Sequence, residues 1–115
     1  MPILTDIQAQ HAAAAGAGGL TRAQWHTIIT DAGTLLEGLA FAAQHGTYAD
    51  NLVTILQEVL CDDTVIQAVL GNVNLGGAGI TLVCQHAHAS DASLAMAVPL
   101  AAAGDIDLII ANANA

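Results

Sequence analysis

The chain has almost no positive charge. It contains 115 residues with no lysine, one arginine (Arg22) and ten aspartate and glutamate residues, so its formal net charge is −9 with neutral histidines. Proteins that bind DNA or RNA neutralise phosphates with lysine and arginine, and proteins that bind anionic lipid surfaces do the same. The composition therefore predicts no nucleic acid partner and no membrane partner.

Charge of either sign is scarce as well. Only 10% of the residues are charged, whereas 55% are apolar, and soluble domains usually carry about 25% charged residues. A surface with so few charges is hard to keep soluble as an isolated monomer. We therefore expect a homo-oligomer, a subunit of a larger protein assembly, or both. A monomer with a neutral, alanine-rich surface is the alternative.

Long apolar runs and targeting signals are missing too. The longest apolar candidate, residues 92–103, is interrupted by Ser93 and Pro99, and a membrane span needs about 18 unbroken apolar residues. The first residues, MPILTDIQAQ, lack the basic region and apolar core of a secretory signal. These absences favour a cytoplasmic protein without a signal peptide.

The two cysteines, Cys61 and Cys84, are too few for a disulfide framework. Buried free thiols are the expected state. A bridge between them, or to a neighbouring subunit, stays open.

Catalytic motifs are lacking. A phosphate-binding P-loop needs a lysine, and Ser90 and Ser93 do not lie in a G-x-S-x-G sequence. The glycine-rich residues 71–79 follow a helix and are interpreted as a linker. Asp62 and Asp63 fit two acids that open a helix and complement its dipole. We therefore predict a non-enzymatic protein with no catalytic residue and no cofactor.

One cluster could bind a metal. On an extended strand Cys84, His86 and His88 would point the same way, and thiolate and imidazole are ligands that zinc prefers. The usual zinc spacings are absent, so we expect a strand end with two exposed histidines and no metal site. A metal-assisted enzyme using these three residues is the least favoured alternative.

The first half of the chain has helical spacing. Residues 3–14 suit a short helix, and Gly16 to Gly19 form a flexible joint, so residues 1–19 are predicted to be a flexible arm. Thr21 is a good N-cap for one long amphipathic helix near residues 22–45, although Gly33 and Gly38 lie inside it. Further helices are expected from about 50 to 60 and after Asp62, ending near Gly71.

Beyond residue 79 apolar residues alternate. The segments near 80–84, 93–99 and 106–110 have the period of strands and are joined by short turns. Asp105 and Asp107 would then share one solvent-facing side. No internal repeat is apparent. The prediction is an α+β fold in which residues 20–115 form one domain, with helices packed on a C-terminal antiparallel β-meander.

A lysine-free, alanine- and glycine-rich chain with a loose N-terminal arm and apolar strands resembles the small structural proteins of tailed-phage particles, such as capsid decoration or tail-associated subunits. The resemblance implies a virion location and a structural role in stabilising an assembly. No functional residue follows from it. A small oligomeric binding or adaptor module is the alternative.

Overall fold

The fold was analysed in a computed structural model that describes residues 3–115, and this part of the chain is entirely helical. It has two short 3-10 turns, η1 (Ala15–Ala17) and η2 (Val98–Leu100). Its eight α-helices are α1 (Leu4–Ala14), α2 (Arg22–Thr30), α3 (Leu36–His45), α4 (Ala49–Gln57), α5 (Asp63–Leu70), α6 (Gly77–Cys84), α7 (Asp91–Ala97) and α8 (Ala103–Ala113). Within residues 3–115 no helix is long and apolar enough to cross a bilayer.

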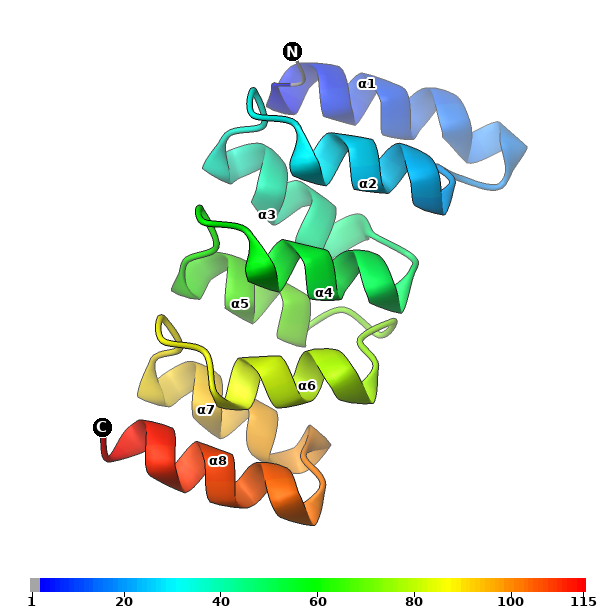
Figure 1. Cartoon of the computed structure of the whole chain (residues 1–115). Coiled ribbons are helices and arrows are strands. Elements are labelled where there is room, and N and C mark those ends of the chain that lie inside the picture. The colour runs from blue at the N-terminus through cyan, green and yellow to red at the C-terminus, as the bar shows by residue number, and fades with distance from the viewer. Residues whose placement is uncertain (1–2) are drawn as a thin grey trace.

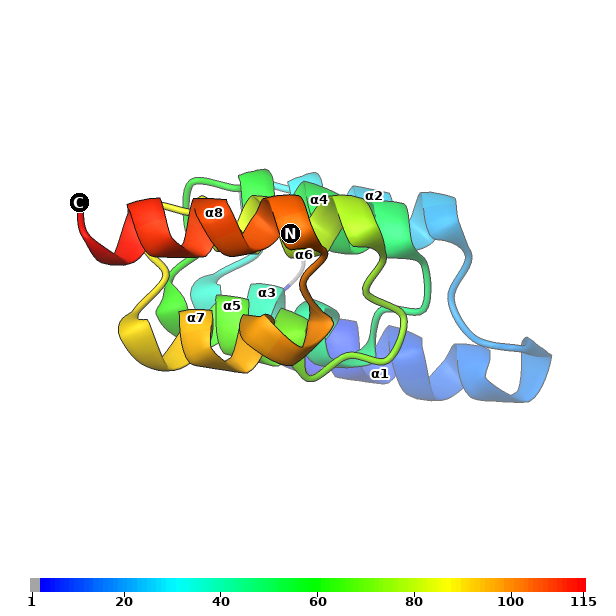
Figure 2. The same cartoon turned by 90° about the horizontal axis from the view of Figure 1, so that it is seen from below.

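The helices form two layers. Helices α2, α4, α6 and α8 lie side by side in one layer, and α1, α3, α5 and α7 lie in the other (Figures 1 and 2). Each layer is stacked in chain order, so the chain begins at one end of the molecule and finishes at the other (Figure 1). The molecule is elongated, with extents of 43 × 24 × 18 Å.

The stack is built from a helix-pair repeat of 26 to 28 residues. The hydrogen bonds that open α2, α4, α6 and α8 are donated by the backbone N–H groups of Trp25, Leu52, Ile80 and Ile106. Those that open α3, α5 and α7 are donated by Leu39, Ile66 and Leu94. The expectation of no internal repeat is therefore wrong, and the fold is an α-solenoid in which each pair packs on its neighbours.

The core follows the same period. Ile28, Ile55, Val83 and Ile109 occupy one position in four successive helices of the first layer, and all are buried. Each short helix therefore contributes the same inner face to a continuous core, which no helix pair could form alone.

The predicted long helix over residues 22–45 is wrong, because residues 31–35 break it. The Asp31 carboxylate accepts a hydrogen bond from the backbone N–H of Gly33 at 2.7 Å, which closes a local turn. The Thr34 hydroxyl donates to the carbonyl of Ile28 at 2.5 Å and covers the end of α2. The two helices on either side, α2 and α3, then lie in different layers.

The predicted β-meander is also wrong, and with it the α+β class. Residues 80–84 lie in α6, 93–97 in α7 and 106–110 in α8, and no strand occurs in residues 3–115. Nearly every residue from 80 to 84 is apolar, so strand and helix periods fit equally well. In α7 the buried residues are Ser93, Leu94 and Ala97, whereas Met96 is exposed, as is Val98 directly after the helix, which is a helical pattern.

Helix α1 packs against α3. Ile7 is completely buried, and a Cβ atom added to Gly38 would lie 2.7 Å from its Cδ1 atom. The missing side chain of Gly38 therefore makes room for Ile7. Between α1 and α2, Gly18 and Gly19 both have φ of +91°, a conformation that side chains disfavour. The mobility of residues 1–19 as an arm stays a prediction.

Polar side chains tie each repeat to the next at helix ends. The amide of Asn72 donates to the carbonyls of Ala43 at 2.9 Å and Gly46 at 2.8 Å, where α3 finishes. The amide of Asn112, in α8, donates to the carbonyls of Cys84 at 3.1 Å and His86 at 3.0 Å, where α6 finishes. Carbonyls left unpaired by a helix end are thus satisfied from the neighbouring repeat.

Asp63 makes a similar link between α5 and α7. Its Oδ1 atom accepts hydrogen bonds from the hydroxyl of Ser93 at 2.6 Å and from the backbone N–H of Ser90 at 2.9 Å. These bonds, that of Ser93 most, lower the pKa of the Asp63 carboxyl. Asp62 caps α5 by accepting from the N–H of Val65, as expected. Asp63 therefore bonds to the next repeat as well as opening its own helix.

We predict that Asp63→Ala lowers the free energy of unfolding by about 1 to 3 kcal/mol, because the buried Ser93 hydroxyl and the Ser90 N–H lose their acceptor. Urea denaturation measures the change. Asp91→Ala is the matched control, since Asp91 opens α7 as Asp63 opens α5 but is exposed. Equal losses in the two variants would contradict the inter-repeat role of Asp63.

Candidate interaction surfaces

The side chains of Cys84, His86 and His88 do not lie on one face of a strand. Cys84 is buried in the last turn of α6, and the two histidines lie in the loop that follows. His86 Nε2 lies 2.9 Å from the carbonyl oxygen of Leu56, and His86 Nδ1 accepts from the backbone N–H of His88 at 3.1 Å. Both contacts are satisfied by the neutral ring with its proton on Nε2. In that state His86 offers no free lone pair to a metal.

Burial also suppresses thiol chemistry. Cys61 and Cys84 are both buried and unbridged. Burial, reinforced by the charge of Asp62, raises the pKa of the Cys61 thiol to about 12, and burial likewise raises that of Cys84. The thiolate is the nucleophile and the metal ligand, so both groups are held in their unreactive form at neutral pH. Within residues 3–115 no three His, Cys, Asp or Glu side chains are grouped as metal ligands.

We predict that the untagged protein binds well below one equivalent of zinc, because the lone pairs of His86 are occupied and Cys84 is a buried thiol. Elemental analysis after dialysis against zinc measures this. A content near one zinc per chain that disappears in a His86→Ala, His88→Ala variant would overturn the assignment.

Two histidines that are distant in the sequence meet in the fold. The rings of His11 in α1 and His45 in α3 have centroids 5.1 Å apart, and Phe41 lies 5.4 Å from His11 and 4.3 Å from His45. Burial, and secondly the nearby His11, lower the pKa of His45. The sequence alone does not connect these residues, because only the packing of α1 on α3 places them together.

This pair predicts a loss of stability in acid. A histidine whose pKa is below its ordinary 6.5 in the folded protein binds protons more readily when unfolded, so stability falls as pH drops below that value. We expect the free energy of unfolding to fall as the pH drops through 6.5 and below, and His45→Gln to reduce that dependence. His26→Gln, at an exposed histidine of α2, is the control. An unchanged slope in His45→Gln would contradict the prediction.

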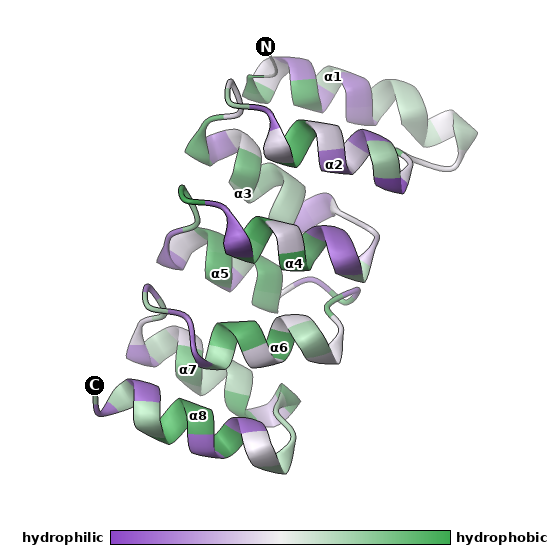
Figure 3. Cartoon of the chain, in the orientation of Figure 1, coloured by the Kyte–Doolittle hydropathy of each residue, from purple (hydrophilic) through white to green (hydrophobic). Residues whose placement is uncertain are grey.

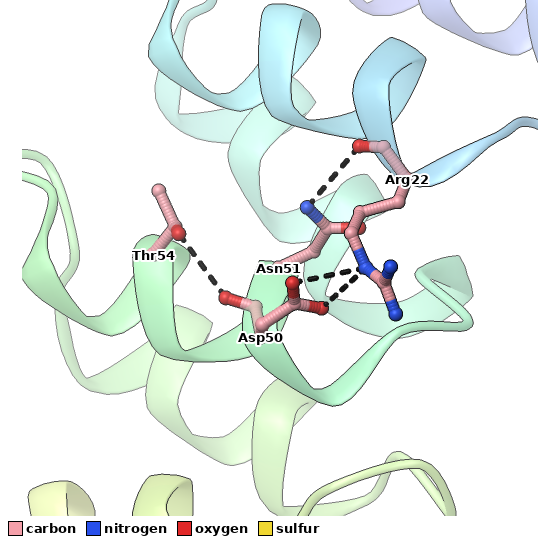
Figure 4. Close-up of polar contacts among 4 residues, drawn as sticks. All are labelled: Arg22, Asp50, Asn51 and Thr54. Carbon is pink, nitrogen blue, oxygen red and sulfur yellow. Dashed lines mark hydrogen bonds and ion pairs between the residues drawn. The ribbon is translucent and has the colours of Figure 1, made fainter.

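The single arginine is engaged within the chain. Its Nε atom lies 2.9 Å from Oδ2 of Asp50, and its guanidinium carbon lies 4.9 Å from the centre of the Tyr48 ring. Figure 4 shows this pair beside Asn51, whose amide donates to the backbone carbonyl of Arg22. The ion pair is exposed and adds little stability. It lies on the edge where α2 and α4 begin, so the opposite edge of the stack has no lysine or arginine at all.

A hollow of about 690 Å³ lies between α1 and α2. Its lining is mainly small or polar: Asp6, Ala9, Gln10, Ala23, Gln24, Thr27, Ile28 and Asp31. It contains two carboxylates but no histidine, cysteine or serine. The only large apolar side chain in this lining is Ile28, which is buried.

The last end of the stack is apolar. Four large apolar side chains of α7, η2 and α8 are each between 41% and 54% exposed: Met96, Val98, Leu100 and Ile110. In Figure 3, α8 has apolar bands between polar ones. This set is called the C-terminal face below.

A third surface follows the edge where α2, α4 and α6 finish, seen at the left of Figure 1. The loop after α2 and the loop after α4 enclose a hollow of about 310 Å³. Its lining combines apolar side chains and two carboxylates: Ile29, Thr30, Asp31, Ala32, Thr34, Leu39, Glu58, Val59 and Leu60. It is called the loop-edge hollow below.

Comparison of the chain with protein-family models, with curated proteins and with solved structures found no match. What the chain does must therefore be inferred from its own residues and geometry.

Proposed function

We propose that this protein is a non-catalytic assembly subunit: a helical-repeat scaffold that associates with a second copy of itself through the C-terminal face. Helical repeat stacks offer extended surfaces to other proteins, and terminal repeats need a polar outer face to stay soluble alone. The last end does not meet that need, because four large apolar side chains are exposed there, whereas the only large apolar side chain lining the hollow at the first end, Ile28, is buried. The contrast between the two ends is the observation that supports self-association.

The exposure of Ile110 is the main evidence for this contact. The residues at the same position of the three preceding repeats are Ile29, Leu56 and Cys84, and all three are buried. Leu56 reaches the next repeat, since its Cδ1 atom would lie 3.9 Å from a Cβ atom on Gly79 of α6. Ile110 is 54% exposed. It is therefore an apolar residue at a position that the repeat normally covers with another helix.

Val98 repeats the pattern in the second layer. It lies 28 residues after Leu70 and 55 residues after Ala43, both of which are buried, but it is itself exposed. A second copy that presents the same face would cover both positions by a twofold contact, which is the commonest arrangement of homo-oligomers. Because this face is apolar and has few charges, two copies can approach without strong repulsion.

A structural role in a virus particle stays a prediction, for which the phage resemblance is the only ground. A binding or adaptor module is equally compatible with a helical-repeat scaffold. Both roles need only protein surfaces. With Arg22 as the sole fixed cation and paired with Asp50, a nucleic acid partner is not proposed.

We predict that the wild-type protein is a dimer or larger at micromolar concentration and that Ile110→Asp is monomeric, because two buried carboxylates would face each other across the contact. Light scattering after size-exclusion chromatography gives the mass. Val73→Asp is the control, since Val73 is 97% exposed in the loop before α6, away from this face.

Circular dichroism must show equal helix content in the three proteins. A monomeric wild-type protein, or dissociation by Val73→Asp as well, would refute association through the C-terminal face.

A further inference from the structure

We infer that the loop-edge hollow binds a polypeptide segment of a different protein, one that inserts an apolar side chain and flanks it with lysine or arginine. This inference does not depend on the proposed self-association, which uses the C-terminal face. It rests on two apolar residues that the repeat does not require and on the charge around them.

The apolar residues are Val59 and Leu60. They are the two central residues of the turn after α4, which is closed by a hydrogen bond from the N–H of Cys61 to the carbonyl of Glu58 at 2.9 Å. Val59 is 95% exposed and Leu60 is 47% exposed. Two bulky apolar side chains therefore stand in solvent at a loop tip beside a hollow, where a partner could cover them.

The other repeats show that this turn does not need them. The turns after α2 and α6 are closed by the same bond, from Thr34 to Asp31 at 3.0 Å and from Ala89 to His86 at 3.2 Å. Their central residues are Ala32 and Gly33 in one, and Ala87 and His88 in the other. Small or polar residues thus form the turn equally well, so Val59 and Leu60 are not explained by folding.

The charge around the hollow selects the partner. The chain has no lysine, and its one arginine lies elsewhere. Six of the ten acidic residues lie on this edge: Asp31, Glu37, Glu58, Asp62, Asp63 and Asp91. Asp62 and Asp63 are used by helix ends, and Asp31 also closes its own turn. The carboxylates of Glu37 and Glu58 accept no hydrogen bond from any group in residues 3–115. Glu58 and Asp31 line the hollow itself.

This charge argues against a second copy as the occupant. A twofold contact at this edge would bring the carboxylates of both copies together with no lysine or arginine to neutralise them, and such like-charge contacts are disfavoured. A basic partner would instead be drawn to the acidic edge and anchored by its apolar residue in the hollow. The apolar anchor supplies affinity and the charges supply orientation and rate of encounter.

The test uses the full chain and three fluorescent synthetic peptides with the same leucine positions, which carry lysine, glutamine or glutamate between them. The lysine peptide should bind saturably, and more weakly as salt is raised, whereas the glutamate peptide should not bind. Fluorescence anisotropy measures the affinities. No saturable binding of the lysine peptide, or equal binding of the glutamate peptide, would overturn the inference.

Matched variants locate the site. A Val59→Ser, Leu60→Ser variant should weaken binding of the lysine peptide about tenfold, whereas Val73→Ser, at an equally exposed valine on the opposite edge, should not. An Asp31→Asn, Glu58→Gln variant should weaken it more than Asp6→Asn, Asp107→Asn, which removes the same charge elsewhere.

If a test variant and its control lost the same affinity for the lysine peptide, the peptide would be attracted non-specifically to an acidic protein. That result would refute binding in the loop-edge hollow. A change in the mass of the protein in the Val59→Ser, Leu60→Ser variant would identify the edge as a self-contact, which would also refute it.

Discussion

The structure depends on burying one apolar face of each short helix against the equivalent helix of the next repeat. The longest α-helices have 11 residues, and isolated helices shorter than about 12–15 residues are marginal in water. Asn72, Asn112 and His86 add hydrogen bonds to carbonyls of the preceding repeat. Packing and these bonds act between neighbours only, so the stack is stabilised one interface at a time.

The same constraint locates the surfaces that remain for other molecules. Interior faces are covered by neighbouring repeats, which leaves the two ends, the two loop edges and the outer faces of the two layers. The first end has a hollow with two carboxylates, the last end is apolar, one loop edge holds Arg22 with Asp50, and the other is acidic around Val59 and Leu60. Each of these surfaces differs from the corresponding part of the other repeats by only a few side chains. A repeat scaffold can therefore acquire a partner at a loop or an end without disturbing its core.

The sequence predicted the helical first half and several helix ends, because the signals there are local. The N-cap at Thr21, the cap at Asp62 and the stop at Gly71 are confirmed. The prediction of strands in the second half was wrong because the continuous apolar residues near Ile80 fit both the strand period and the helix period. Tertiary packing decided between the two. The repeat was missed because its equivalent positions hold different residues, as with Trp25 and Leu52. Comparison of the three turns then distinguishes Val59 and Leu60, but only once the repeat is known.

Hydrogen exchange on the native protein tests the stacking most directly. Asn112→Ala removes two bonds between α8 and α6, whereas Asn114→Ala removes one bond within α8. If stability is passed between neighbours, the first substitution should lower amide protection in α8 and α6 and leave α2 and α3 unchanged, and the second should change little. A uniform loss of protection from α2 to α8 in Asn112→Ala would show one indivisible core and would contradict the nearest-neighbour account.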